Sequence, residues 1–110
     1  MAEQTSETPI LDLLASMTAD SLEVSSLDPE SLMLVRIAAL VAMDAPPISY
    51  VINLEAAGEL GIDAEQVRGV LAAVAPIVGT ARVASATSKI VRALALELEL
   101  AELEATEEES

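Results

Sequence analysis

Residues 32–61, LMLVRIAALVAMDAPPISYVINLEAAGELG, decide the fold of this chain. The segment opens with a run from Leu32 to Met43 that is apolar on nearly every side and carries one charge, Arg36. A helix that is apolar all round is usually buried all round. The prolines at 46–47 end this run, because proline lacks a backbone N–H and restricts the residue before it. The segment predicts a central buried helix and then a second helix from Pro47 to Leu60.

Start signals for two more helices lie before this segment. Thr8-Pro9 is typical of an N-cap followed by the first helical residue. The apolar residues after it predict a short amphipathic helix that reaches Met17. Residues 18–27 show no clear period, so we expect a loop there. Asp28-Pro29 then marks the start of the central helix.

Two further helices are predicted after Gly61, a residue that favours a helix end. Asp63 and Gln66 form a capping-box pattern, and apolar residues follow at a spacing of three to four, with Pro76 near the predicted end. The last helix is expected from about Arg82 to Leu103. It carries two apolar stripes, which indicate one packing surface within the subunit and another between subunits.

The expected fold class is therefore all-α, a compact bundle of about five to six helices assembled as a homo-oligomer. A single helical domain is expected over residues 8–105. A flexible N-terminus over residues 1–7 should precede it, because that segment is polar. An acidic disordered tail should follow over residues 106–110.

Composition supports the homo-oligomer. The chain has 110 residues, of which 53% are hydrophobic, more than a small monomer can readily bury. The longest apolar run is Leu32 to Met43, which is too short for a membrane span of about 20 residues. No secretory signal pattern is visible. We expect a cytoplasmic protein that buries apolar surface against copies of itself.

The chain contains no Cys and no His. This excludes disulfides, thiol nucleophiles and imidazole as a base or metal ligand, and we expect neither a cofactor nor a metal. The net charge of −14 repels phosphate backbones, so nucleic acid is not an expected partner. Most acids lie at the two ends of the chain, where their charge keeps an apolar assembly soluble.

The order of the helices resembles one known family. The apolar helix SLMLVRIAALVAM leads through a break to SYVINLEAAGELGIDAEQVRGVLAAVAPIVGTARVASA. This pattern, with Ala56-Ala57, Gly61, residues 63–68, Gly79 and Arg82, is similar to the carboxymuconolactone decarboxylase-like family, which includes alkylhydroperoxidase D. The resemblance covers about residues 28–100. It implies an all-α fold and homo-oligomers, commonly trimers or hexamers.

The functional residues of that family are replaced here. Its redox branch carries Cys-x-x-Cys-x-x-x-His on the short helix, and these positions fall on Pro46, Ser49 and Asn53. An upstream Glu of the family would fall near Met33 or Leu34. Peroxidase chemistry needs a thiolate, which this chain cannot form. The decarboxylase branch generally keeps the His, whereas Asn53 cannot shuttle a proton near neutral pH.

Several polar residues remain as candidates. Ser49 and Asn53 lie four residues apart on one helix face and form a small polar patch that would orient a ligand, although bonds within the helix or across an interface explain it better. Tyr50, the only aromatic residue, would act as an acid or hold a carboxylate, although packing of its ring explains it better. Arg82 and Lys89 lie roughly on one helix face and would bind an anion, or pair with acids of a neighbouring subunit. Glu55 and Glu59 are spaced to hold a hard cation, although a solvated face explains them better.

These residues lead to three hypotheses. The first is a non-redox member of the family that works as an oligomeric binding or structural protein. The alternative is a cofactor-independent lactone decarboxylase-type enzyme with a rebuilt active site, in which Ser49, Tyr50 and Asn53 orient the substrate and Arg82 or Lys89 holds its carboxylate. The third is a small-molecule binding protein with an apolar pocket between subunits. The residues leave catalysis open and favour binding.

Overall fold

The computed structural model describes the backbone of residues 7–109, and the side chains of residues 7–95 and of Leu103. The described residues form five helices and no strand, which confirms the all-α prediction. Residues 1–6, most of the expected flexible N-terminus, lie outside this description. The side chains after residue 95 on the two stripes predicted for the last helix also lie outside it, except that of Leu103.

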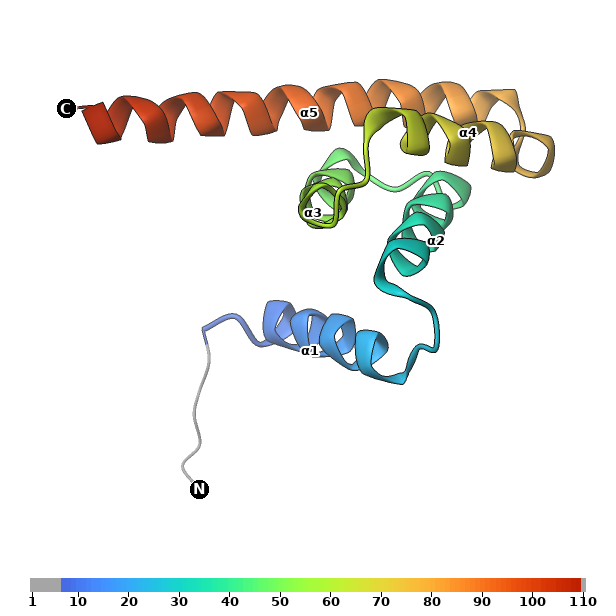
Figure 1. Cartoon of the computed structure of the whole chain (residues 1–110), viewed down its shortest axis with the longest axis horizontal. Coiled ribbons are helices and arrows are strands. Elements are labelled where there is room, and N and C mark those ends of the chain that lie inside the picture. The colour runs from blue at the N-terminus through green and yellow to red at the C-terminus, as the bar shows by residue number, and fades with distance from the viewer. Residues whose placement is uncertain (1–6, 110) are drawn as a thin grey trace.

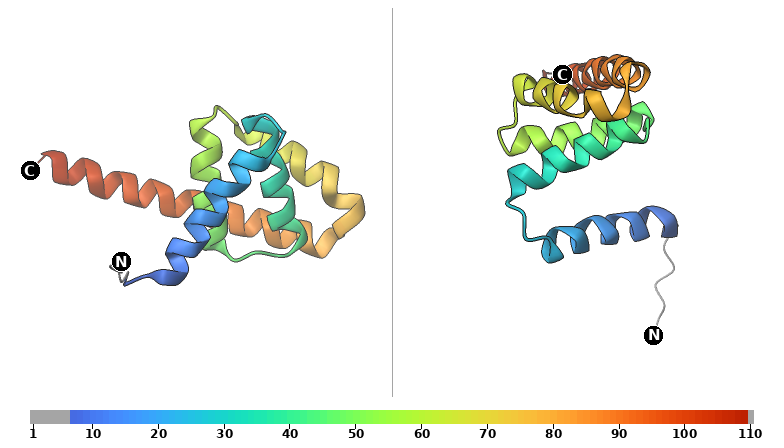
Figure 2. Two further views of the ribbon diagram at one scale, coloured as in Figure 1. Left: turned by 90° about the horizontal axis from the view of Figure 1, so that it is seen from below. Right: turned by 90° about the vertical axis from the view of Figure 1, so that its right-hand side faces the viewer.

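Four helices, α2 to α5, form the bundle (Figure 1). They are α2 (Pro29–Ala42), α3 (Pro47–Glu59), α4 (Ala64–Val78) and α5 (Thr80–Glu109). Helix α2 packs against α3 and α4, and α5 packs across α3 and α4. The views in Figures 1 and 2 show α2 and α3 as one layer, with α4 and the first half of α5 as a second layer over it.

Local signals set most of the helix boundaries. Asp28 caps α2 by accepting a hydrogen bond from the backbone N–H of Ser31 at 3.2 Å. The predicted capping box is present at α4, where Gln66 N–H donates to Asp63 and Asp63 N–H donates back to the Gln66 side chain, at 2.9 and 3.0 Å. Gly79 ends α4 with a φ of 91°, a left-handed conformation that favours glycine.

Two helices are longer than the sequence predicts. Helix α1 spans Pro9–Val24, so it continues through residues 18–24, where a loop was expected. Helix α5 continues to Glu109, through the segment for which a disordered acidic tail was expected. Local preference explains the addition to α5, because Ala and Glu favour helix even where no apolar stripe is evident. Residues 18–24 also contain Thr, Asp, Ser and Val, so helix preference alone does not explain the addition to α1.

The core consists of two adjoining clusters inside the bundle. Helix α2 supplies both, with Ile37 in one and Val41 in the other, each fully buried. Tyr50 of α3 and Ala93 of α5 complete the second cluster, also fully buried. The long α5 and the layer of α2 and α3 thus meet over a continuous apolar core.

Helix α1 lies apart from this bundle and is joined to it by residues 25–28. None of its residues is buried. The radius of gyration is 16.2 Å, compared with about 13 Å for a compact chain of about 100 residues. The outlying α1 and the projecting C-terminal half of α5 account for the difference (Figure 2).

Candidate functional site

The positions of the family's motif lie along the first two turns of α3. Pro46 is the N-cap residue, and Ser49 and Asn53 are half-buried. The Asn53 side-chain nitrogen donates a hydrogen bond to the backbone carbonyl of Ser49 at 2.9 Å. This bond holds the Asn53 amide against its own helix and leaves its amide oxygen and one N–H to orient a ligand.

Tyr50 lies in a different environment from Ser49 and Asn53. Its side chain is fully buried in the cluster between α2, α3 and α5, and its hydroxyl has no hydrogen-bond partner. Burial raises the pKa of the Tyr50 phenol, and the negative charge of Asp44 raises it further. The structure therefore does not bring the three candidate residues into one open pocket.

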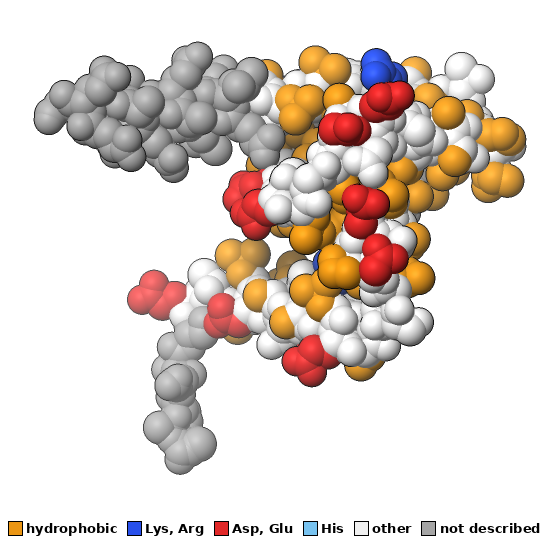
Figure 3. Space-filling model, viewed as in Figure 1, with side chains coloured by type: hydrophobic (Ala, Val, Ile, Leu, Met, Phe, Trp, Pro, Cys, Tyr) orange, Lys and Arg blue, Asp and Glu red, His pale blue; other side chains and the backbone are white. Residues whose placement is uncertain are grey.

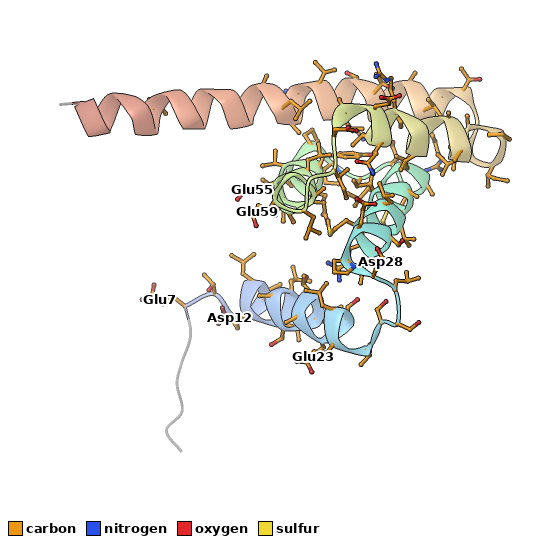
Figure 4. All side chains as sticks on the ribbon, in the orientation of Figure 1. Glu7, Asp12, Glu23, Asp28, Glu55 and Glu59 are labelled. Atoms are coloured by element: carbon orange, nitrogen blue, oxygen red, sulfur yellow. The ribbon has the colours of Figure 1, made fainter. Side chains whose placement is uncertain are left out.

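The position that would correspond to the family's upstream Glu, near Met33, lies in apolar surroundings. Met33 is buried in the first core cluster with Ile37, Ala57 and Ile62. Glu55 and Glu59 project from α3 toward open space, on the side where α1 lies (Figure 4). No group of three or more acidic side chains that would hold a metal ion occurs among the described residues.

Arg82 and Lys89 fasten the turn between α2 and α3 to α5. The Arg82 guanidinium donates to the backbone carbonyl of Ala42 at 2.7 Å, at the C-terminus of α2. The Lys89 ammonium lies 2.9 Å from an Asp44 carboxylate oxygen, and the Ser85 hydroxyl donates to the same oxygen at 2.7 Å. Both basic candidates thus bind groups of their own chain.

Asp44 lies in the turn between α2 and α3 and accepts two of these bonds, and this bonded turn is called the Asp44 corner. Its φ of 55° is left-handed, a conformation that Asp tolerates better than most residues. The hydrogen bonds from Lys89 and Ser85 hold the pKa of the Asp44 carboxyl below its ordinary value. No local pattern indicates these bonds, because the bonded residues lie about 40 positions apart in the sequence.

An apolar groove of about 380 Å³ runs between α3, α4 and α5. Its walls are Leu54 and Ala57 of α3, Val67 and Leu71 of α4, and Ile90 and Leu94 of α5. Arg68 and Thr87 lie at its edge, and Gly58 leaves a gap in its wall. Pockets of this size and character are typical of small-molecule sites. The sequence could not locate the groove, because its lining comes from three separate helices.

A second, more open crevice of about 350 Å³ separates α1 from α2 and α3. Leu14 and Met17 of α1 line one side, and Ala39 and Leu40 of α2 line the other. Arg36 and Asn53 also border this crevice. Figure 3 shows hydrophobic side chains on both sides of the hollow between α1 and the bundle.

Comparison of the chain with models of known protein families, with curated proteins and with solved structures found no match. The described part of the chain also contains no helix that is both long enough and apolar enough to cross a membrane.

Proposed function

We propose that this chain is a non-redox, carboxymuconolactone decarboxylase-like protein that assembles with copies of itself and binds a small apolar ligand. The observation that carries the binding proposal is the groove between α3, α4 and α5. Its walls are almost wholly aliphatic, and its polar groups lie only at the rim. A groove of this kind favours a ligand with an apolar body and one polar end.

The assembly proposal is supported by the surface of the chain. Among the described residues, large hydrophobic side chains remain exposed on every helix, including Ile52 at 63% and Val91 at 62%. A surface with so many exposed apolar side chains marks interaction sites in soluble proteins. The lining residue Val91 also connects this exposed surface to the groove.

The alternative of a rebuilt decarboxylase-type site receives less support. Such a site needs a proton donor that reaches the substrate. Tyr50 is the only phenol in the chain, and its hydroxyl is buried in the core. Arg82 and Lys89, proposed to hold the substrate carboxylate, are bonded at the corner around Asp44.

Two glycine substitutions test the groove with the fluorescent apolar dye Nile red as the probe. Gly58→Leu would place a side chain in open space at the groove wall, whereas Gly69→Leu would place it in open space on α4 outside the lining. Both replace a helical glycine, so each should gain up to about 1 kcal/mol of helix preference.

We expect Gly58→Leu to weaken dye binding at least tenfold, whereas Gly69→Leu should bind as the wild type does. Equal binding by the two variants, or no binding by the wild type, would refute the groove as the site. Turnover of a lactone or a peroxide by the pure protein would refute the proposal that the chain is a non-redox protein that only binds its ligand.

A further inference from the structure

Helix α1 is an apolar helix that its own chain leaves uncovered. It has 16 residues and no buried side chain. Leu11, Leu13 and Met17 are 63%, 56% and 57% exposed. An isolated helix of this length is only marginally stable in water, so most of its stability must come from packing. The bundle of the same chain does not supply that packing.

The layer of α2 and α3 that faces α1 is likewise uncovered. Val35 of α2 and Ile52 of α3 are 56% and 63% exposed. Ala39, which follows Val35 by one turn, and Leu40 line the crevice beneath α1. The two facing surfaces therefore both present aliphatic side chains, with an open crevice between them.

Arg36 is the charged residue in this crevice. Its side chain is half-buried, and its one hydrogen bond runs to the backbone carbonyl of Thr18 at 3.4 Å, a long contact. No acidic side chain pairs with it in the described part of the chain. A half-buried guanidinium is more stable beside a carboxylate, so the crevice favours an occupant that is both apolar and acidic.

Helix α1 is itself a helix of that kind. Its charged residues are Asp12, Asp20 and Glu23, and it carries no basic residue.

We propose that α1 is an exchange arm, and that the α1 helix of a second copy packs on the α2–α3 layer in place of the chain's own α1. The apolar side chains of the incoming α1 cover Ala39 and Leu40, which line the crevice, and one of its carboxylates pairs with Arg36. The connection at residues 25–28 lets each copy extend its arm to the other. This inference rests on the proposed assembly and names the surface that forms it.

A matched pair of charge insertions tests the arm. Leu14→Lys places an ammonium on the crevice side of α1, in the crevice that holds Arg36, and Ile77→Lys places one at an exposed position on α4. We expect the wild type to form a multiple of its 11.4 kDa mass by light scattering. Leu14→Lys should weaken that assembly at least a hundredfold, because like charges repel, whereas Ile77→Lys should leave it unchanged.

The absence of cysteine from the chain allows a second, direct test. A tagged Met17→Cys copy is mixed with an untagged Ala39→Cys copy and oxidised. We expect a mixed disulfide between the two copies, because Met17 and Ala39 border the same crevice. An Ile77→Cys copy in place of the Ala39→Cys copy should give far less of the mixed product.

The outcomes separate this inference from the proposed assembly. A wild type that stays monomeric overturns both. If the wild type and Leu14→Lys assemble equally well, and no mixed disulfide forms through Ala39→Cys, the exchange arm alone is overturned. A monomer that carries a bound small molecule in the crevice, seen by native mass spectrometry, would also overturn it.

Discussion

Helices α1 and α2 are both apolar and similar in length, yet only α2 is buried. Helix α2 has 14 residues and buries Leu32, Met33, Ile37 and Val41. Helix α1 has 16 residues and buries none. The comparison shows that the apolar content of a helix establishes that it needs a partner surface, but not that the surface belongs to the same chain.

The two helices also differ in how they are fastened. The C-terminus of α2 is bonded to α5 through Arg82, and the turn that follows it is bonded through Ser85 and Lys89. Helix α1 is tied by the connection at residues 25–28 and by one long hydrogen bond from Arg36. The C-terminal end of α2 is thus bonded to α5, whereas α1 remains free to change partners.

The largest expected difference between α1 and α2 is the change in the free energy of unfolding when one isoleucine of each helix is truncated. Ile37→Ala removes a fully buried side chain of α2 and should lower the free energy of unfolding by about 2–5 kcal/mol, because a cavity remains. Ile10→Ala removes a side chain that is 67% exposed on α1 and should cost less than about 0.5 kcal/mol.

Urea unfolding followed by circular dichroism measures both changes, at a protein concentration low enough for the chain to be monomeric. A large cost for Ile10→Ala under these conditions would show that α1 packs onto its own bundle. The comparison between the two helices would then fail.

A smaller effect is expected at Tyr50, whose buried hydroxyl lacks a hydrogen-bond partner. Tyr50→Phe removes that hydroxyl, and an unpaired buried polar group costs about 1–3 kcal/mol, so we expect the variant to be more stable by about 1 kcal/mol. Because burial raises the pKa of the folded phenol above 10.0, the wild type should also lose stability as the pH rises past that value.

Tyr50→Phe should not show this alkaline loss. The chain has one Tyr and no Trp, so tyrosinate absorbance reports this group alone. A lower stability of Tyr50→Phe would mean that the hydroxyl has a hydrogen-bond partner. A phenol that ionises at or below its ordinary pKa would mean that water or a hydrogen-bond donor reaches its oxygen. Water would then reach the core around α2, although its side chains are buried in the structure.

The parts of the fold that the sequence predicted are those with local signals. The starts of α2 and α3 follow Asp28-Pro29 and the prolines at 46–47, and the start of α4 follows the Asp63–Gln66 capping box. Each signal acts within a few residues, through a side chain or a missing N–H, and so survives without tertiary information.

The parts that the sequence did not predict depend on contacts between distant residues. The groove joins Leu54 to Leu94, and the corner at Asp44 joins α2 to α5. The spacing of Ser49 and Asn53 correctly indicated a shared helix face, but it could not show that Tyr50 faces the core instead. Side-chain direction at these positions follows from packing, which no local pattern contains.

The smallest expected effect sharpens the contrast between the fastened bundle and the loose arm. The bonds from Lys89 and Ser85 lower the pKa of Asp44 in the folded chain below its ordinary value of 3.8. A carboxyl of this kind stabilises the fold above its unfolded pKa, and that stability is lost as the pH falls from about 3.8 through the folded value. Asp44→Asn keeps a residue that tolerates the left-handed backbone but cannot ionise. We expect the variant to be slightly less stable at neutral pH and to lose less stability on acidification, as measured by urea unfolding across that range. If the variant and the wild type lose the same free energy of unfolding on acidification, the Asp44 carboxylate does not hold the end of α2 to α5. The difference between the bonded bundle and the unbonded α1 would then not depend on this carboxylate.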